Sequence, residues 1–354
     1  MGIIIAIIIF GLIVMVHEFG HFICAKLSKV RVLEFSIGMG PKIIQKKKGE
    51  TMYSLRLLPV GGYCAMEGED EDSDDPHSFR SAKLWKRMII LVAGAGMNFV
   101  LGFVAIVVMM SMLGSVPTTQ ISGFSAIELE DGTLERHSAS YDSGLRHDDI
   151  FYEIDGTRIF SMLDLNYILS SSPTNVHDVV VKRNGEKIEI DDVKFENANG
   201  GTVDFGLVQK DKNPLTVVKG SGEMFMSMGH IVGMSLKQLV SGQAKKEDVS
   251  GPVGVVTAIN ETTQESEDAK DIFFNLVYMT ALITINIGIF NLLPIPGLDG
   301  GRLIFCFIEL IRRKPVKPEH EGYVHLAGML LLFGIMIFAT YNDIVRLISG
   351  GGQL

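Results

Sequence analysis

Two histidines and a glutamate lie inside the apolar run that opens the chain. Residues 3–16 contain no charged side chain, and His17, Glu18 and His21 follow before the apolar character resumes at residues 22–25. Ionisable side chains in such a segment are costly unless they have partners or a function. Because the run is long enough to cross a bilayer, we expect a retained helix over residues 2–26 with this polar group near its C-terminal end.

The spacing of these three residues points to metal chemistry. Side chains four residues apart lie one above the other on a helix, so both imidazoles can reach one Zn²⁺. Glu18 then lies beside the open position of the metal, where it can take a proton from water, as in zinc hydrolases. The alternative is a pair of histidines that are hydrogen-bonded inside a helical bundle.

Composition limits the class of protein. The chain has 354 residues, of which 47% are hydrophobic and 21% are charged, so we expect a few membrane spans plus a soluble module. Cys24, Cys64 and Cys306 are far apart, which predicts neither a disulfide framework nor a cysteine zinc site. The net charge of -9 argues against nucleic acid as a partner.

The distribution of basic residues predicts the topology. Residues 26–87 carry twelve Lys and Arg, and residues 302–317 are also basic, so both connections should be cytoplasmic. Both termini and the soluble module are then extracytoplasmic. The predicted order is a first transmembrane helix at 1–26, a cytoplasmic β region at 27–87, a second transmembrane helix at 88–113, a soluble module at 115–212, an amphipathic helix region at 213–255, a third and broken transmembrane segment at 272–301, a cytoplasmic loop at 302–322 and a fourth transmembrane helix at 323–346.

We expect β-hairpins in the first cytoplasmic connection. Residues 35–41 and 52–63 are β-prone and bounded by Gly and Pro. An apolar hairpin could dip into the bilayer if its backbone is buried against protein, and an open edge could hold a substrate as an added strand. A surface hairpin is the alternative. The acidic run at 67–75 is interpreted as a solvated linker.

The soluble module has α/β character. Residues 143–156 predict a turn, a strand and a second turn, and further strands are expected at 176–183 and 187–195. The stretch resembles the signature of PDZ domains, although Asp148 replaces the usual glycine. Aspartate tolerates the left-handed backbone conformation, so this departure does not endanger the fold.

The third apolar segment predicts a broken helix. Pro294 and Pro296 cannot continue a helix, so the backbone should be irregular where it lines a cavity. Asp299 follows directly, and it is the only acid between Asp271 and Glu309. It is a candidate third metal ligand, with a simple turn residue as the alternative.

Six stretches together resemble the site-2 protease family of intramembrane zinc metalloproteases, in its bacterial single-PDZ form. They follow the family's order over nearly the whole chain and lie at residues 17–21, 35–41, 58–63, 94–98, 251–254 and 291–300. The resemblance implies a multi-pass α-helical membrane protein with about four transmembrane helices, a re-entrant β-hairpin region and an inserted extracytoplasmic PDZ-like domain.

The resemblance also implies a function and residue roles. It suggests hydrolysis of a peptide bond within or near transmembrane segments of single-pass membrane proteins, such as anti-sigma factors or signal-peptide remnants. The enzyme would lie in the bacterial cell membrane, with its active site toward the cytoplasm. The residues implied are His17, His21 and Asp299 as Zn²⁺ ligands, Glu18 as the catalytic base, and Gly61, Gly62, Tyr63 and Asn291 as substrate-binding residues.

Two other classes of protein compete with a protease. A catalytically silent membrane PDZ binding protein would have a structural zinc site closed by four protein ligands. A metal-ion transporter would need further ligands in other spans, where we find only Asn98, Asn286 and, near an end, Asp343. Glu18 beside His17 has little purpose in either, so we favour the protease.

Overall fold

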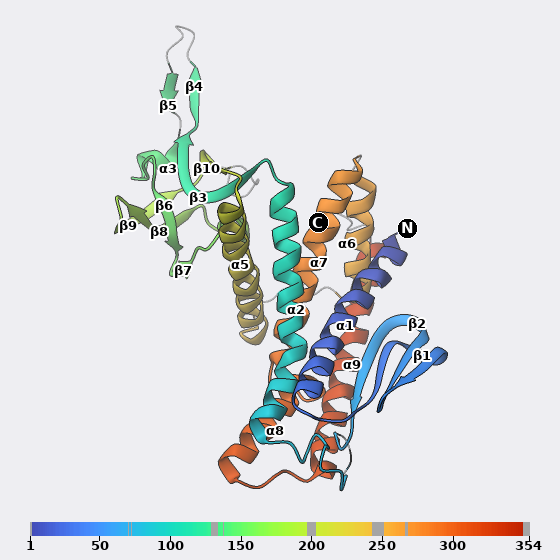
Figure 1. Ribbon diagram of the computed structural model, residues 1–354. Helices are drawn as coiled ribbons and strands as arrows, with labels where there is room; N and C mark the ends of the chain where they lie inside the picture. Colours follow the sequence, from blue (N-terminus) through green and yellow to red (C-terminus); the bar gives the residue numbers. More distant parts are fainter. Residues whose placement is uncertain are drawn as a thin grey trace. The chain divides into compact units, whose positions relative to one another are not determined.

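The computed structural model describes residues 2–69, 71, 73–128, 134–136, 138–196, 203–242, 251–265 and 268–349 (Figure 1). The chain forms two compact units. One, here called the helical unit, comprises Met1–Ala105 and Gln238–Leu354, and the other, the sheet unit, comprises Ile106–Lys237. Each is described by itself.

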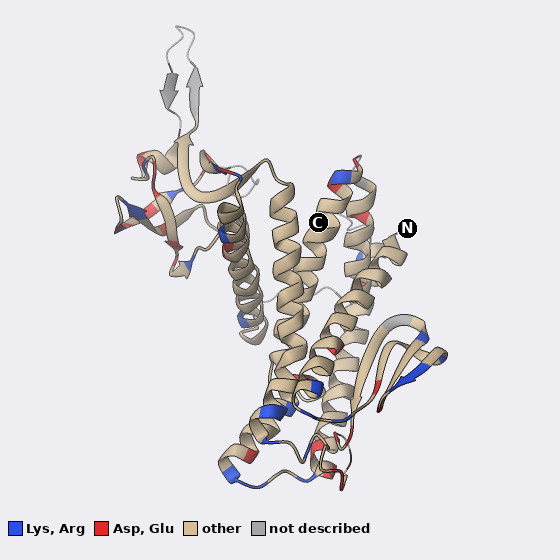
Figure 2. Ribbon diagram, in the orientation of Figure 1, with Lys and Arg blue, Asp and Glu red and all other residues tan. Residues whose placement is uncertain are grey.

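Four helices are long and apolar enough to cross a membrane, as predicted: α1 (Gly2–Leu27), α2 (Leu84–Met112), α7 (Ala269–Leu292) and α9 (Pro318–Ile348). Lys and Arg are sparse along most of their length (Figure 2). α2 and α9 start before the apolar runs that predicted them, at 88 and 323, because their first turns include polar residues. Pro318 favours the start of α9, since proline fits the first helical turn.

Small residues let the helices of the helical unit approach one another closely. A Cβ on Gly20 of α1 would lie 2.3 Å from the carbonyl oxygen of Ala93 in α2. A Cβ on Gly288 of α7 would lie 2.7 Å from the Phe99 ring of α2. Close approach at glycine is typical of membrane helix packing, and here α2 contacts α1 through its backbone and α7 through the Phe99 side chain.

Two further helices lie where the sequence indicated loops or a break. α8 (Asp299–Arg312) occupies the first part of the predicted loop at 302–322. α6 (Pro252–Glu265) begins within residues 251–254, one of the six family-like stretches, and extends past the end of the predicted amphipathic region at 255. The buried carboxylate of Asp343 in α9 accepts hydrogen bonds from the backbone N–H groups of Gly251 and Gly254, and thereby caps the start of α6.

The strands β1 (Val32–Lys48) and β2 (Thr51–Met66) form a bent antiparallel hairpin in the helical unit. The first part of β1, near residues 34–37, pairs with residues 52–55 and also with residues 62–65 of β2. The second part of β1 pairs with β2 as far as Lys48 opposite Thr51. As a result, residues 62–65 form one edge of the small sheet.

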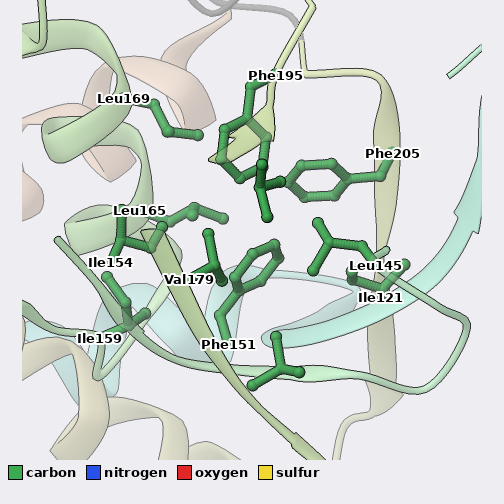
Figure 3. Packing of buried hydrophobic residues seen from close by; sticks show 12 residues of the cluster. Ile121, Leu145, Phe151, Ile154, Ile159, Leu165, Leu169, Val179, Phe195 and Phe205 are labelled. Carbon is green, nitrogen blue, oxygen red and sulfur yellow. The ribbon is translucent and has the colours of Figure 1, made fainter. Parts of the chain in front are cut away.

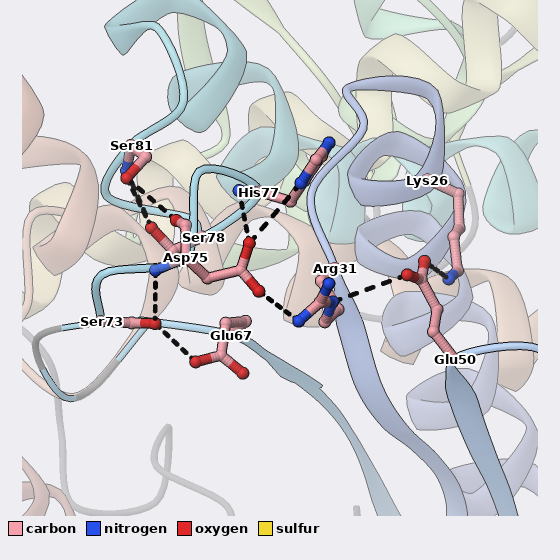
Figure 4. Close-up of polar contacts among 9 residues, drawn as sticks. All are labelled: Lys26, Arg31, Glu50, Glu67, Ser73, Asp75, His77, Ser78 and Ser81. Carbon is pink, nitrogen blue, oxygen red and sulfur yellow. Dashed lines mark hydrogen bonds and ion pairs between the residues drawn. The ribbon is translucent and has the colours of Figure 1, made fainter.

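The acidic stretch after β2 is tied to its neighbours (Figure 4). Asp75 forms an ion pair with Arg31, and Ser73 donates a hydrogen bond of 2.6 Å to Glu67. Glu50, in the hairpin turn, accepts a bond of 2.8 Å from Lys26 at the end of α1. The described part of 67–75 is therefore more ordered than the solvated linker that its charge suggested.

The sheet unit contains an antiparallel sheet in the order β10-β3-β6-β8-β9, with β7 beside β6. A separate ribbon pairs β4 with β5. The strands are β3 (Ser115–Phe124), β4 (Ala126–Glu128), β5 (Leu134–Arg136), β6 (Ile150–Ile154), β7 (Thr157–Arg158), β8 (Val176–Arg183), β9 (Glu186–Lys194) and β10 (Phe205–Asp211), and the helices are α3 (Ala139–Asp142), α4 (Met162–Ser171) and α5 (Pro214–Val240), which runs past the end of the unit.

The core of the sheet unit is aromatic and aliphatic (Figure 3). Phe151, Phe195 and Phe205 meet with ring centroids 5.2–6.4 Å apart. Asp149 of the PDZ-like signature is fully buried and accepts two hydrogen bonds from the Arg183 guanidinium, so its role is to hold the turn. Asp148 has a φ of +66°, the left-handed conformation that aspartate tolerates.

Candidate metal centre

The two histidines lie on one face of α1, where their spacing placed them. Both are buried, with 8% of His17 and 6% of His21 exposed, and their ring centroids are 4.8 Å apart. Burial of two imidazoles in an apolar helix requires partners for their ring nitrogens.

Asp299 joins them from a distant part of the chain. The prolines end α7 at Leu292, and α8 begins at Asp299 after a short irregular segment. The Oδ2 atom of Asp299 lies 3.0 Å from Nε2 of His17 and 3.2 Å from Nε2 of His21. The two Nε2 atoms are themselves 3.1 Å apart.

This triangle fits a zinc ion. Ligand atoms about 2.0 Å from one tetrahedral zinc are about 3.3 Å apart, which is close to the observed separations. Nδ1 of His21 donates to the carbonyl oxygen of Ile90 at 2.8 Å, so the lone pair of a neutral His21 is on Nε2. Lone pairs of nitrogen and carboxylate oxygen that converge in a buried place repel one another unless a cation lies between them.

Asn98 of α2 contacts Nδ1 of His17, the ring nitrogen that does not face Asp299. Its fully buried side-chain amide nitrogen lies 3.3 Å from Nδ1 of His17. The amide oxygen of Asn98 has no hydrogen-bond partner among the described residues. Turning the amide over would let this oxygen accept the Nδ1 proton and direct Nε2 to a metal. From the sequence, Asn98 can be expected to form a hydrogen bond with a neighbouring helix, and the packing of α2 on α1 makes His17 that neighbour.

Gly94 makes room for the imidazoles. A Cβ at this position would lie 2.4 Å from Nε2 of His21 and 2.7 Å from Nε2 of His17. In contrast, a Cβ on Gly96 would meet no atom within 4 Å. Of these two glycines, Gly94 is therefore the one that the histidine pair requires.

The triad opens into a cavity of about 410 Å³. Glu18 and Tyr63 line it beside the three candidate ligands, and Glu69 and Arg302, which form an ion pair, also contribute to its wall. Gly61, Gly62 and Asn291 are not among its lining residues. Gly62 nevertheless lies close to the site, since a Cβ there would be 3.5 Å from Cγ of Glu18.

Tyr63 is held at the cavity by a charged network on the hairpin. Its hydroxyl contacts the guanidinium of Arg56, which donates a hydrogen bond of 2.9 Å to Glu34. Burial alone would raise the pKa of Glu34, but hydrogen bonds with Ser54, Tyr63 and Arg56 outweigh it and lower the pKa to about 2. The carboxylate of Glu34 is therefore a stable anion that keeps Arg56 beside Tyr63.

The fold and the site define a class: proteins with four helices long enough to cross a membrane, in which two buried histidines and an aspartate could hold a metal ion beside a glutamate. Comparison with known families assigns residues 5–335 to Peptidase family M50. The chain belongs to this family, and Zn²⁺ is its expected cofactor.

Relatives cover nearly the whole chain. A Clostridium perfringens protein assigned as a zinc metalloprotease is 33% identical, with 98% of this chain and 99% of the relative aligned. The regulator of sigma-W protease RasP of Bacillus subtilis is 30% identical, with 96% and 97% aligned. A zinc metalloprotease RasP of Oceanobacillus iheyensis is also 30% identical, with 96% and 98% aligned.

Proposed function

We propose that this chain is an intramembrane-cleaving zinc metalloprotease, a site-2 protease. The observation that carries the proposal is the position of Glu18, which lines the same cavity as a set of three candidate ligands in a protein with four apolar helices. Three protein ligands leave one tetrahedral position open, whereas a structural zinc site is normally closed by four.

The residues divide the chemistry among them. His17, His21 and Asp299 would hold Zn²⁺ through Nε2, Nε2 and a carboxylate oxygen. Bound there, Zn²⁺ supplies a Lewis acid that polarises the scissile carbonyl and makes water easier to deprotonate. Glu18 would take the proton from the attacking water and return it to the leaving amine. Ile90 and Asn98 hold the outer nitrogens of the imidazoles, and so orient the rings.

The hairpin supports a way to hold the substrate. Among the described residues, the edge at 62–65 of β2 pairs only with β1, and it passes Glu18 at Gly62. An extended peptide could add to this edge as a strand and present its backbone to the cavity. The substrate helix must first unwind, because a helical amide is shielded by its own hydrogen bonds. We assign Gly61, Gly62 and Tyr63 to this function, and Asn291 to a contact farther along the substrate.

The remaining assignments concern membrane placement and substrates. Basic residues at 26–87 and 302–317 support a cytoplasmic location for the connections and the metal site, and an extracytoplasmic location for the sheet unit. We interpret the sheet unit as a PDZ-like domain that filters substrates by the size of their outer part. The name of the Bacillus subtilis relative, regulator of sigma-W protease, supports anti-sigma factors as a substrate class.

Cleavage of a single-pass membrane protein by the purified chain in detergent tests the proposal. We expect cleavage within or near the transmembrane segment, loss of cleavage after zinc is removed with a chelator, and recovery when Zn²⁺ is added back. A chain that binds zinc but cleaves neither intact nor outer-domain-trimmed substrates would instead be the silent binding protein.

A further inference from the structure

The irregular segment that carries Asp299 to the metal site lies directly against α9. A Cβ on Gly328 of α9 would be 2.0 Å from the carbonyl oxygen of Pro296, so the two backbones touch. Gly297 has a φ of +95°, and a Cβ there would approach the backbone nitrogen of Met329 to 3.1 Å. The segment before Asp299 therefore packs directly against α9.

One side chain of α9 forms a hydrogen bond with this segment. Nδ1 of His325 accepts from the backbone N–H of Gly297 at 2.9 Å. His325 lies three residues before Gly328, so both residues belong to one face of α9. Gly297 is partly buried, and a backbone N–H shielded from water is costly without an acceptor, so this bond favours one position of Gly297.

The position of Gly297 matters because Asp299 follows two residues later. Leu298 caps α8 without a side-chain hydrogen bond, so no side chain at the N-cap fixes the first turn of α8. Yet the Asp299 carboxylate must stay near 3 Å from two imidazoles that belong to another helix. A shift of 1 Å in the segment would remove it from the ligand set.

We propose that His325 is a positioning residue for the metal centre, which holds the third ligand, Asp299, in place by accepting the Gly297 amide proton. The inference rests on the proposed function, because it takes Asp299 to be a zinc ligand. His325 would then act through a hydrogen bond to the backbone beside the ligand and not as a metal ligand itself.

Zinc affinity of the purified full-length chain, measured in detergent by competition with a chelator, tests the proposal. His325→Leu removes the acceptor, and we expect the zinc Kd to rise about 10–100-fold, as for other residues that orient ligands. His325→Asn places an oxygen where Nδ1 was, and it should restore the Kd to within about threefold of the wild type. His320→Leu, at an exposed position near the start of the same helix, should leave the Kd unchanged.

Two results would overturn the proposal: an unchanged Kd in His325→Leu, or an equal loss of affinity in His325→Asn. If His325→Leu does not fold, a glycine pair gives the answer. Gly328→Ala would push Pro296 away and should weaken zinc binding, whereas Gly334→Ala, which meets nothing within 4 Å, should not. Equal affinity in both glycine variants would contradict the account. Because zinc binding is read without proteolysis, a chain that binds zinc but cleaves nothing would overturn the proposed function alone.

Discussion

At the scale of single residues, the candidate metal centre depends on close contacts between helices. His17 and His21 come from α1, Asp299 from α8, and the groups that contact the outer ring nitrogens from α2. A side chain larger than hydrogen at position 94 of α2 would therefore move an imidazole.

Gly94→Ala tests whether the imidazoles need the space that this glycine leaves beside them. The added methyl group would lie 2.4 Å from Nε2 of His21, so we expect the zinc Kd to rise more than about tenfold and cleavage to fall in parallel. Gly96→Ala is the matched control, since its methyl group would meet nothing within 4 Å. The account fails at this scale if the two variants bind zinc equally well, as titration with a chelator would show.

The sequence predicted part of this site. Helical spacing alone put His17 and His21 on one face, and the prolines predicted that Asp299 would follow a break in the backbone. The partners of the imidazoles could not be predicted, because Asn98 and Ile90 reach them only through the way α2 packs on α1. The contact of His325 could not be predicted either, because its hydrogen-bond partner is the backbone N–H of Gly297.

At the scale of elements, the bent hairpin is a small sheet with a charged centre. Glu34 accepts hydrogen bonds from Ser54 and Arg56, and Lys42 lies 3.5 Å away. Because the pKa of Glu34 is lowered to about 2, its interactions stabilise the fold above its ordinary pKa of 4.5 and are lost as the pH falls through about 2.

Glu34→Gln should therefore lower the Tm at pH 7, with a smaller difference from the wild type as the pH falls from about 4.5 toward 2. Thermal unfolding in detergent at a series of pH values measures this difference. Glu189→Gln, at an exposed position of the sheet unit, is the control and should show little effect. A Tm difference that is constant with pH would show that the charge of Glu34 does not stabilise the hairpin.

Helices marked by a long apolar run were predicted from the sequence, whereas α6 and α8 were not. Long, mainly apolar runs predicted the four long helices. α6 was missed because its start depends on Asp343, which is about 90 residues away in the chain and caps it from α9. α8 was interpreted as loop because its charged residues resemble those of a cytoplasmic connection, although its Cys306 is buried.

At the scale of the whole molecule, the chain has two units with separate hydrophobic cores. The core of the sheet unit consists of residues from 121 to 205, whereas all candidate metal ligands belong to the helical unit. A substitution that destabilises the core of the sheet unit should therefore leave zinc binding in the helical unit unchanged.

Phe151→Ala provides the test. Phe151 is 2% exposed, and truncation of a buried phenylalanine costs about 3–5 kcal/mol. We expect faster hydrogen exchange throughout the sheet unit, measured by mass spectrometry, with an unchanged zinc content. Loss of zinc in this variant would mean that the metal centre depends on the sheet unit.

The central claim, that Glu18 acts as a base beside a zinc ion held by His17, His21 and Asp299, is tested most directly by one paired measurement. Zinc per chain and cleavage of a transmembrane peptide are determined together for the wild type, Glu18→Gln and Asp299→Ala. The account predicts one zinc and cleavage in the wild type, one zinc without cleavage in Glu18→Gln, and weakened zinc binding in Asp299→Ala. Unchanged cleavage by Glu18→Gln, or equal zinc affinity in all three with no cleavage by the wild type, would contradict it.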